Sequence, residues 1–280
     1  MKKKLVFGYE ATVRVKITRL IINLMKKIFF LNYNNFFSNE FYQNSNLTNE
    51  IVFNKKKLLF KTGHGRLNWR VESFYSEEPM MIEWINKFSR NDVFLDIGAN
   101  VGIYSIAVAS QGSLVYSAEL DPKNISILFE NIHLNKLHKN CLILPFALSD
   151  KNEIVKIFYR DFSIGDALQS LKKKSKLPTR YGDKFEINQI SFTLDDTFKF
   201  FKLKQPSKIK IDVDGNEKVV ISGGKKIISR AKEIYIEDNG ISDDFYIKSF
   251  LKKNKFKEIS KLKINKSDNK DIYNRIYRKS

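Results

Sequence analysis

The segment from Asp92 to Tyr104, D-V-F-L-D-I-G-A-N-V-G-I-Y, constrains the fold of this chain more than any other. This segment begins with a short apolar run, Val93, Phe94, Leu95 and Ile97, typical of a parallel strand that is covered on both faces. Gly98 ends this run, and after Gly102 apolar residues recur at helical spacing until Gln111-Gly112. A strand, a glycine turn and a helix in this order predict the first half of a βαβ unit in an α/β fold.

A turn of this kind directs backbone N–H groups and a helix N-terminus toward a ligand. The turn lacks the Lys-Ser or Lys-Thr of a phosphate loop, and its glycine spacing is not the dinucleotide pattern G-x-G-x-x-G. Asp96, at the carboxyl end of the predicted strand, would repel a pyrophosphate. It suits a ligand with hydroxyl groups and a positive charge, and S-adenosylmethionine is such a ligand.

A second acidic residue follows the next predicted strand. Residues 114–117 form that strand, and Glu119 lies twenty-three positions after Asp96. A carboxylate about 20 residues beyond the glycine turn is how nucleotide-binding α/β folds hold the two ribose hydroxyls. Asp96, Asn100 and Glu119 together therefore favour an adenosyl ligand over an ordinary tight turn.

At this point the sequence resembles the FkbM family of S-adenosylmethionine-dependent methyltransferases, over roughly residues 77–238. The resemblance rests on five motifs in order: D-I-G-A-N-V-G-I-Y, A-E-L-D-P-K-N, F-A-L-S-D, T-L-D-D and K-I-D-V-D-G-N-E. It implies a Rossmann-like class I methyltransferase fold, α/β and doubly wound, with a mostly parallel seven-stranded sheet. It also implies O-methylation of a small molecule or of a sugar or glycan hydroxyl, with S-adenosylmethionine as cofactor.

The expected cofactor site follows from these motifs. Glu78 precedes the helix before the first strand, where it either approaches the cofactor's amino group or caps that helix. Phe146, Ala147 and Leu148 are expected to line the adenine, since apolar atoms pack on a flat ring. The full set of expected cofactor-binding residues is Glu78, Asp96, Gly98, Ala99, Asn100, Gly102, Tyr104, Glu119, Leu120, Phe146, Ala147, Leu148 and Asp212.

Four carboxylates are the expected catalytic residues, because they cluster at the carboxyl ends of two further predicted strands, 208–213 and 234–236. They are Asp212, Asp214, Glu217 and Glu237. The hypothesis makes Asp212 the positioning residue or general base and the other three supporting candidates. No metal site is assigned, since no ligand spacing is diagnostic, but Asp212, Glu237 and Asp238 could supply oxygen ligands to a metal-assisted O-methyltransferase.

The net charge of +19 raises nucleic acid as an alternative acceptor. Residues 71–247 carry 24 basic and 25 acidic residues, a net charge of −1, whereas residues 1–70 and 248–280 are strongly basic. The strand at 208–213 is not followed by the Asn/Asp-Pro-Pro-Tyr element of base-methylating enzymes. We therefore expect a small-molecule or glycan acceptor and disfavour nucleic acid. A nucleic-acid methyltransferase that uses the basic flanks and a non-catalytic binding protein remain the alternatives.

The predicted organisation is a basic extension over residues 1–70 and a methyltransferase domain over 71–280, with 151–205 as an insertion or lid. The extension contains an amphipathic basic helix at 13–31, which either packs on the domain or lies on an anionic membrane surface, and a hairpin formed by 51–53 and 58–60. The lone cysteine, Cys141, excludes an internal disulfide. A cytoplasmic location, with peripheral contact at the inner membrane surface through residues 13–31, is expected; the sequence does not indicate an oligomeric state.

Overall fold

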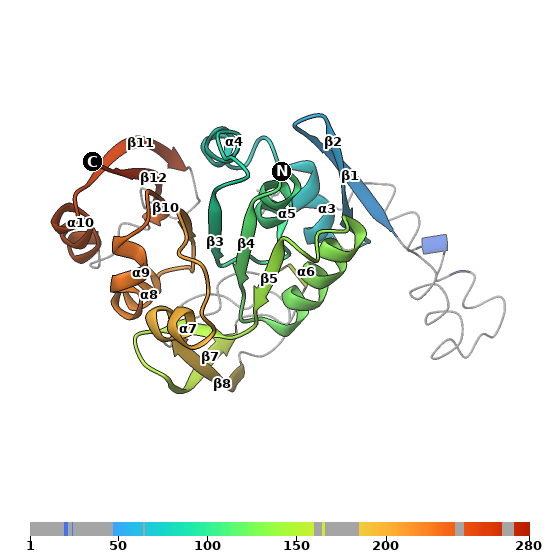
Figure 1. Cartoon of the computed structure of the whole chain (residues 1–280). Helices are drawn as coiled ribbons and strands as arrows, with labels where there is room; N and C mark the ends of the chain where they lie inside the picture. The colour runs from blue at the N-terminus through green and yellow to red at the C-terminus, as the bar shows by residue number, and fades with distance from the viewer. Residues whose placement is uncertain are drawn as a thin grey trace, which may run out of the picture.

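A seven-stranded, mostly parallel sheet forms the centre of the molecule (Figure 1). The computed structural model describes residues 20, 21, 24, 47–63, 65–159, 164–165, 185–238, 244–264 and 272–280. The strand order is β11-β12-β10-β9-β3-β4-β5, and the expected doubly wound α/β fold is confirmed. The five parallel strands are β3 (Val93–Ile97), β4 (Leu114–Ala118), β5 (Cys141–Leu144), β9 (Lys208–Ile211) and β10 (Glu233–Asp238).

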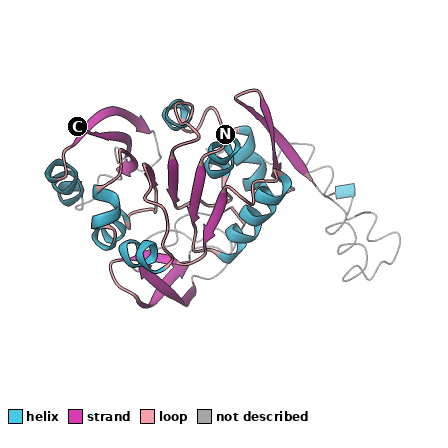
Figure 2. Cartoon of the chain, in the orientation of Figure 1, coloured by secondary structure: helices cyan, strands magenta, loops and turns pink. Residues whose placement is uncertain are grey.

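Helices cover both faces of this sheet (Figure 2). One face packs against α4 (Pro79–Ile85), α5 (Ile103–Ser110) and α6 (Pro122–Leu134). The other packs against α7 (Leu194–Phe200), α8 (Glu217–Gly223), α9 (Lys225–Ser229) and α10 (Asp244–Lys253). Every residue of β3 is buried, Asp96 included, as its apolar residues predict for a strand covered on both faces.

Two antiparallel strands, β11 and β12, form the edge of the sheet next to β10. β12 (Ile272–Lys279) lies between β10 and β11 (Phe256–Ile264) and is antiparallel to both. Directly opposed residues on β10 and β12 are Tyr235 with Ile276 and Glu237 with Asn274. This register decides which side chains of β12 share a face with the acidic end of β10.

An N-terminal hairpin packs against α5 and α6. Its strands are β1 (Thr48–Phe53) and β2 (Lys56–Lys61), and the two turn residues, Asn54 and Lys55, both have positive φ. Such a turn matches the twist of paired strands. The buried side chains of the hairpin join the same hydrophobic core as α4, α5 and α6: Ile51, Phe53, Leu58 and Phe60. The helix α3 (Gly65–Glu72), which follows the hairpin, was not predicted.

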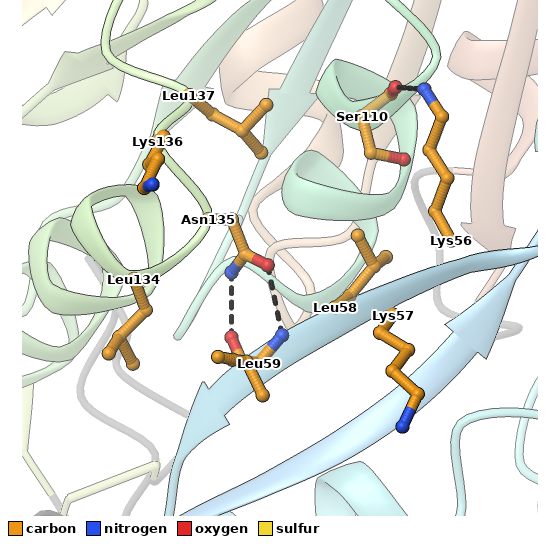
Figure 3. Close-up of a pocket in the computed structure, with 9 residues that line it drawn as sticks. All are labelled: Lys56, Lys57, Leu58, Leu59, Ser110, Leu134, Asn135, Lys136 and Leu137. Carbon is orange, nitrogen blue, oxygen red and sulfur yellow. Dashed lines mark hydrogen bonds between the residues drawn. The ribbon is translucent and has the colours of Figure 1, made fainter.

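Amide side chains of α6 and its C-cap satisfy the free edge of β2. The Asn135 amide accepts from the Leu59 N–H at 2.9 Å and donates to the Leu59 carbonyl at 2.6 Å (Figure 3). One turn earlier, Asn131 accepts from the Lys61 N–H at 2.7 Å and donates to the Val101 carbonyl at 2.8 Å. The Lys56 amine donates to the Ser110 carbonyl at the end of α5 (Figure 3). These bonds fix the hairpin on the domain.

A second, three-stranded sheet lies beside the main one, in the order β6-β8-β7. It consists of β6 (Ala147–Ser149), β7 (Glu153–Tyr159) and β8 (Phe185–Thr193). β5 ends at Leu144, before Pro145, and the chain passes into the small sheet at Ala147. β7 and β8 both lie within 151–205, the segment predicted as an insertion or lid.

Two predicted segments fall largely on residues that the structure does not describe. The amphipathic helix at 13–31 is described only at Leu20, Ile21 and Leu24, which are helical and exposed. Within the predicted insertion or lid, 151–205, residues 160–163 and 166–184 also lie outside the described residues. Each helix within the described ranges is too short or too polar to cross a lipid bilayer.

Candidate active site

The sequence-predicted acidic residues converge at one edge of the main sheet. Since β3, β4, β9 and β10 are parallel, their carboxyl ends lie at the same edge of the sheet. The strand order reverses at β3: β4 pairs with one side of β3, and β9 pairs with the other side. Open α/β sheets bind ligands at such a switch point. Asp96, Glu119, Asp212 and Glu237 all lie at or just after these strand ends.

The glycines of the turn after β3 are required by chain packing. Gly98 has a φ of +80°, and a Cβ there would lie 1.9 Å from the Asp212 carbonyl oxygen. Gly102 has a φ of +83°, and a Cβ there would lie 2.2 Å from Leu128 Cδ1. Gly98 thus lets the turn lie directly on the end of β9, and Gly102 lets it lie on α6. Close approach of a ligand was the predicted reason, but contacts within the protein already demand glycine at both positions.

The N–H groups of this turn are bonded within the protein. Those of Gly98 and Ala99 both donate to the Ala118 carbonyl at 3.0 Å, and that of Asn100 donates to Glu119 Oε2 at 2.7 Å. The expectation that the turn directs bare N–H groups at a ligand is therefore wrong for these three residues. The start of α5 differs, because no side chain caps it at Gly102 and the first N–H groups of a helix have no partner within the helix. Within this corner, the start of α5 is therefore the place that suits the negative charge of a ligand.

Glu119 is held rigidly at the end of β4. Its carboxylate accepts from the N–H groups of Asn100, Leu120 and Asp121 at 2.7, 2.9 and 2.8 Å, and the residue is 7% exposed. Burial raises the pKa of this carboxyl group to about 7, although the three hydrogen bonds lower it. A carboxylate has about four acceptor sites, so capacity remains for a ligand hydroxyl.

A buried lysine connects two of the predicted acids. Lys210, in β9, is 2% exposed, and its Nζ lies 3.4 Å from Asp96 Oδ1 and 3.1 Å from Asp212 Oδ2. Burial lowers the pKa of Lys210, but the charges of Asp212 and Asp96 raise it more, so the lysine stays charged. Asp96 is 1% exposed and also accepts from the Ser105 hydroxyl at 2.7 Å. Asp96 is therefore buried below the edge of the sheet, and the ammonium group of Lys210 links it to the partly exposed carboxylate of Asp212.

Two of the four predicted catalytic acids belong to the turn after β9. Glu217 accepts from the Gly215 N–H at 3.0 Å and from the Val213 N–H at 3.4 Å. Burial raises its pKa to about 7. Asp214 lies in the same turn with a φ of +51°. The carboxylate of Glu217 thus stabilises the turn that presents Asp212.

The other two predicted catalytic acids meet a third carboxylate. Glu78, Asp212 and Glu237 each offer an oxygen atom, and these atoms lie within 4.8 Å of one another. Glu78 occupies the N-cap position of α4 but makes no capping hydrogen bond with its side chain, and it accepts from the Tyr235 hydroxyl at 3.4 Å. Asp238 is not part of this acid cluster, because its carboxylate accepts from Arg275 Nε at 2.7 Å.

The apolar residues expected around an adenine are only partly accessible. Leu120 and Phe146 are half-buried beside the end of β4, and the rings of Phe146 and Phe192 lie 5.0 Å apart. Ala147 and Leu148 are buried in β6. Tyr104 is half-buried on α5 with Lys210 Nζ 6.0 Å from its ring centre. Burial, followed by the charges of Glu78 and Asp212, raises the pKa of Tyr104, so it remains a neutral phenol.

Comparison with known families identifies the domain. The model of the Methyltransferase FkbM domain matches residues 96–264, more than half of the chain. This chain belongs to the FkbM methyltransferase family. The resemblance first seen in the five motifs is thereby confirmed.

Curated relatives match shorter segments. The chain is similar to the tRNA (guanine(37)-N(1))-methyltransferase of Phytophthora infestans, with 27% identity over 122 residues that cover 44% of this chain and 28% of that protein. It is also similar to the enzyme of the same activity from Methanocaldococcus jannaschii, with 42% identity over 71 residues, 25% of this chain and 20% of that one. The chain thus spans less than a third of the length of either.

Among solved structures, the FkbM methyltransferase of Methylobacillus flagellatus aligns with a TM-score of 0.46 and 15% identity over 69% of this chain and 44% of that one.

S-adenosylmethionine is the cofactor of this FkbM methyltransferase domain, and the chemistry of the edge fits it. The cofactor carries a sulfonium, which suits the partly exposed carboxylate of Asp212 at this edge. Its own carboxylate suits the uncapped start of α5, and its two ribose hydroxyls suit the carboxylate of Glu119. When bound, it supplies an electrophilic methyl group.

Proposed function

We propose that this S-adenosylmethionine-dependent methyltransferase acts on an acceptor atom that carries a proton, and that Asp212 orients the acceptor and accepts that proton. The observation that carries the proposal is the place of Asp212. It follows β9 at the switch point, is partly exposed, and belongs to the acid cluster with Glu78 and Glu237. A carboxylate in that place contacts both the cofactor's sulfonium end and the acceptor.

In this proposal Glu119 holds the ribose, and Leu120 and Phe146 contact the adenine. Asp96 positions Asp212 through Lys210, because one buried ammonium group is paired with both carboxylates. Methyl transfer from a sulfonium is an in-line displacement, so fixed geometry supplies much of the acceleration, about 7–11 kcal/mol. Three N–H groups on Glu119 and a charged lysine on Asp212 provide that fixed geometry.

The first acceptor class we propose is an RNA base. Both curated relatives named above are tRNA (guanine(37)-N(1))-methyltransferases, and the atom in the name of that activity, N1 of guanine, carries a proton. The net charge of +19, concentrated in the two ends of the chain, agrees with a polyanionic partner. These observations support nucleic acid better than the small-molecule acceptor that the sequence alone favoured.

A hydroxyl group of a small molecule or glycan is the second acceptor class. The specific observation that favours it lies at the end of β9, where the chain continues as Asp212-Val213-Asp214-Gly215 and not as the Asn/Asp-Pro-Pro-Tyr element of base-methylating enzymes. A hydroxyl also carries a proton that Asp212 could accept, so the two classes share the same catalytic arrangement.

Transfer of labelled methyl groups from S-adenosylmethionine separates the two classes. The full chain is incubated with unmodified tRNA in one arm and with a panel of sugars, glycans and small alcohols in the other. Label in tRNA that digests to a methylated guanosine supports the first class, and label only in the panel supports the second. Isothermal titration with S-adenosylmethionine is run alongside. Absence of cofactor binding would overturn the proposed function as a whole.

A further inference from the structure

We propose that the acid cluster of Glu78, Asp212 and Glu237, together with Asn274, binds one divalent cation of the hard, oxygen-preferring class such as Mg²⁺ or Mn²⁺. The three carboxylates come from the start of α4, the end of β9 and the end of β10, and their oxygens lie within 4.8 Å of one another. Glu237 is 3% exposed. Three carboxylates at this spacing repel one another, and the repulsion grows with burial.

Asn274 provides the second, independent observation. It is 1% exposed, and neither its amide nitrogen nor its amide oxygen has a hydrogen-bond partner among the residues that the structure describes. A buried polar group without a partner costs about 1–3 kcal/mol, so a ligand that satisfies this amide is expected.

The register of the sheet directs Asn274 toward the acid cluster. Asn274 lies directly opposite Glu237 in the antiparallel pair of β10 and β12, and opposed residues project from the same face. The preceding pair on that face, Tyr235 and Ile276, packs in the same core as α4, the helix that Glu78 precedes. The amide is therefore on the face of Glu237 and Glu78 and not on that of Asp238.

The ligand set selects the kind of cation. Carboxylate and amide oxygens are the ligands of Mg²⁺, Mn²⁺ and Ca²⁺, whereas zinc sites are built largely from histidine and cysteine, which this set lacks. Four protein oxygens leave coordination positions for water or for an acceptor oxygen. Lys210 is 3.1 Å from one carboxylate oxygen of Asp212, Oδ2, and a carboxylate has a second oxygen to offer. The Asn274 oxygen ligates the cation, and its NH₂ group can donate to a bound water.

The cation site lies next to the proposed methyl-transfer centre, and a role in orienting the acceptor would rest on the proposed function. Cation binding itself does not, because it is measured without cofactor, acceptor or turnover. The probe is Mn²⁺, titrated into the full chain and followed by the electron paramagnetic resonance signal of free Mn²⁺. We expect one Mn²⁺ per chain, displaced by excess Mg²⁺.

Three variants and a control make the test specific. We expect Glu237→Gln to remove the stoichiometric site and Asn274→Ala to weaken Mn²⁺ binding about tenfold or more. Glu258→Gln is the matched control, since Glu258 is a nearby carboxylate that accepts from Arg275 at 2.6 Å and is outside the acid cluster. If Glu237→Gln does not fold, by circular dichroism, Glu78→Gln replaces it, because Glu78 is partly exposed.

Two results would overturn the proposal. One is the absence of stoichiometric Mn²⁺ binding to the folded wild-type chain. The other is wild-type affinity in Asn274→Ala together with the folded glutamate variant. If Mn²⁺ does not bind but S-adenosylmethionine does, the cation site is disproved and the proposed function stands. If Mn²⁺ binds but S-adenosylmethionine does not, only the proposed function is disproved.

Discussion

The carboxylates on the two sides of the switch point, at the end of β4 and at the ends of β9 and β10, differ in their surroundings. At the end of β4, Glu119 accepts hydrogen bonds from three backbone N–H groups, so its position is set by the chain itself. At the ends of β9 and β10, Asp212 and Glu237 lie close to Glu78, and the neighbouring Asn274 amide makes no hydrogen bond within the described part of the chain. The first carboxylate is fixed by backbone N–H groups, whereas the second group lies where we propose that the acceptor and a cation bind. We therefore expect substitutions on the first side to affect stability and cofactor affinity, and those on the second to affect turnover.

The largest expected effect is on the β9 side. Asp212→Asn removes the proposed proton acceptor but keeps the shape of the side chain, and we expect the turnover rate to fall about 10²- to 10⁴-fold. Affinity for S-adenosylmethionine, measured by isothermal titration, should change much less. Asp214→Asn, in the same turn, is the matched variant and should retain most activity. Full turnover of Asp212→Asn at saturating cofactor would show that Asp212 is not the base.

On the β3 side, Gly98→Ala should strongly reduce the free energy of unfolding. The new Cβ would lie 1.9 Å from the Asp212 carbonyl oxygen at a φ of +80°, so we expect a loss of at least about 3 kcal/mol in urea denaturation. Gly165→Ala is a matched control, because Gly165 has a similar φ of +74° but its Cβ would meet neighbours only at 3.4 Å. Equal effects of the two substitutions would mean that backbone strain, and not the close approach to β9, makes Gly98 necessary.

A smaller effect is expected from the ionisation of Glu119. Its pKa of about 7 means that the carboxylate form, which accepts hydroxyl hydrogen bonds best, is lost as the pH falls below 7. The Kd for S-adenosylmethionine should therefore rise about tenfold between pH 8 and pH 6. Glu119→Gln cannot ionise, so its Kd should be higher at pH 8 and change little over this range. A wild-type Kd that is constant with pH would contradict this role.

The smallest expected effect concerns the docking of the hairpin. Asn135→Ala removes two hydrogen bonds to Leu59 and should lower the free energy of unfolding by about 1–2 kcal/mol. Lys57→Ala removes only an exposed ion pair with Glu50 and should change it by less than about 0.5 kcal/mol. Chemical denaturation of the two variants provides the comparison. If Asn135→Ala lowers the free energy of unfolding no more than Lys57→Ala does, the buried side chains of the hairpin alone keep it docked on the domain.

The parallel strands were predictable because their apolar residues are gathered in short segments that clear helix signals separate, and the doubly wound order was predicted from the family resemblance. The parallel strands β3 and β4, for example, lie within a residue of their expected bounds. The small sheet was not predictable in the same way. β8 alternates apolar and polar residues within a polar segment, and its pairing with β6 and β7 is a long-range contact that no local pattern records.

The site was predictable where a side chain follows a strand, since strand ends determine position. Asp212 and Glu237 were named from that reasoning, and Glu78 was named from its place before the helix that precedes the first strand. Lys210 and Asn274 were missed, because a lysine inside K-I-K-I and an asparagine inside I-Y-N-R-I look like ordinary strand residues facing solvent. Only the register of β9 between β3 and β10, and of β12 against β10, places them beside the acids.

The buried ammonium of Lys210 also limits how this sheet can change. Neutralisation of Lys210 alone would leave the carboxylates of Asp96 and Asp212 without their shared counter-charge, whereas neutralisation of either acid alone leaves the lysine paired with the other. Paired replacement of Lys210 and Asp96 by uncharged residues should therefore be less harmful to folding than the sum of the two single replacements. Lys210 is thus expected to be replaceable only together with the buried acid beside it, whereas Asp212 can be neutralised alone.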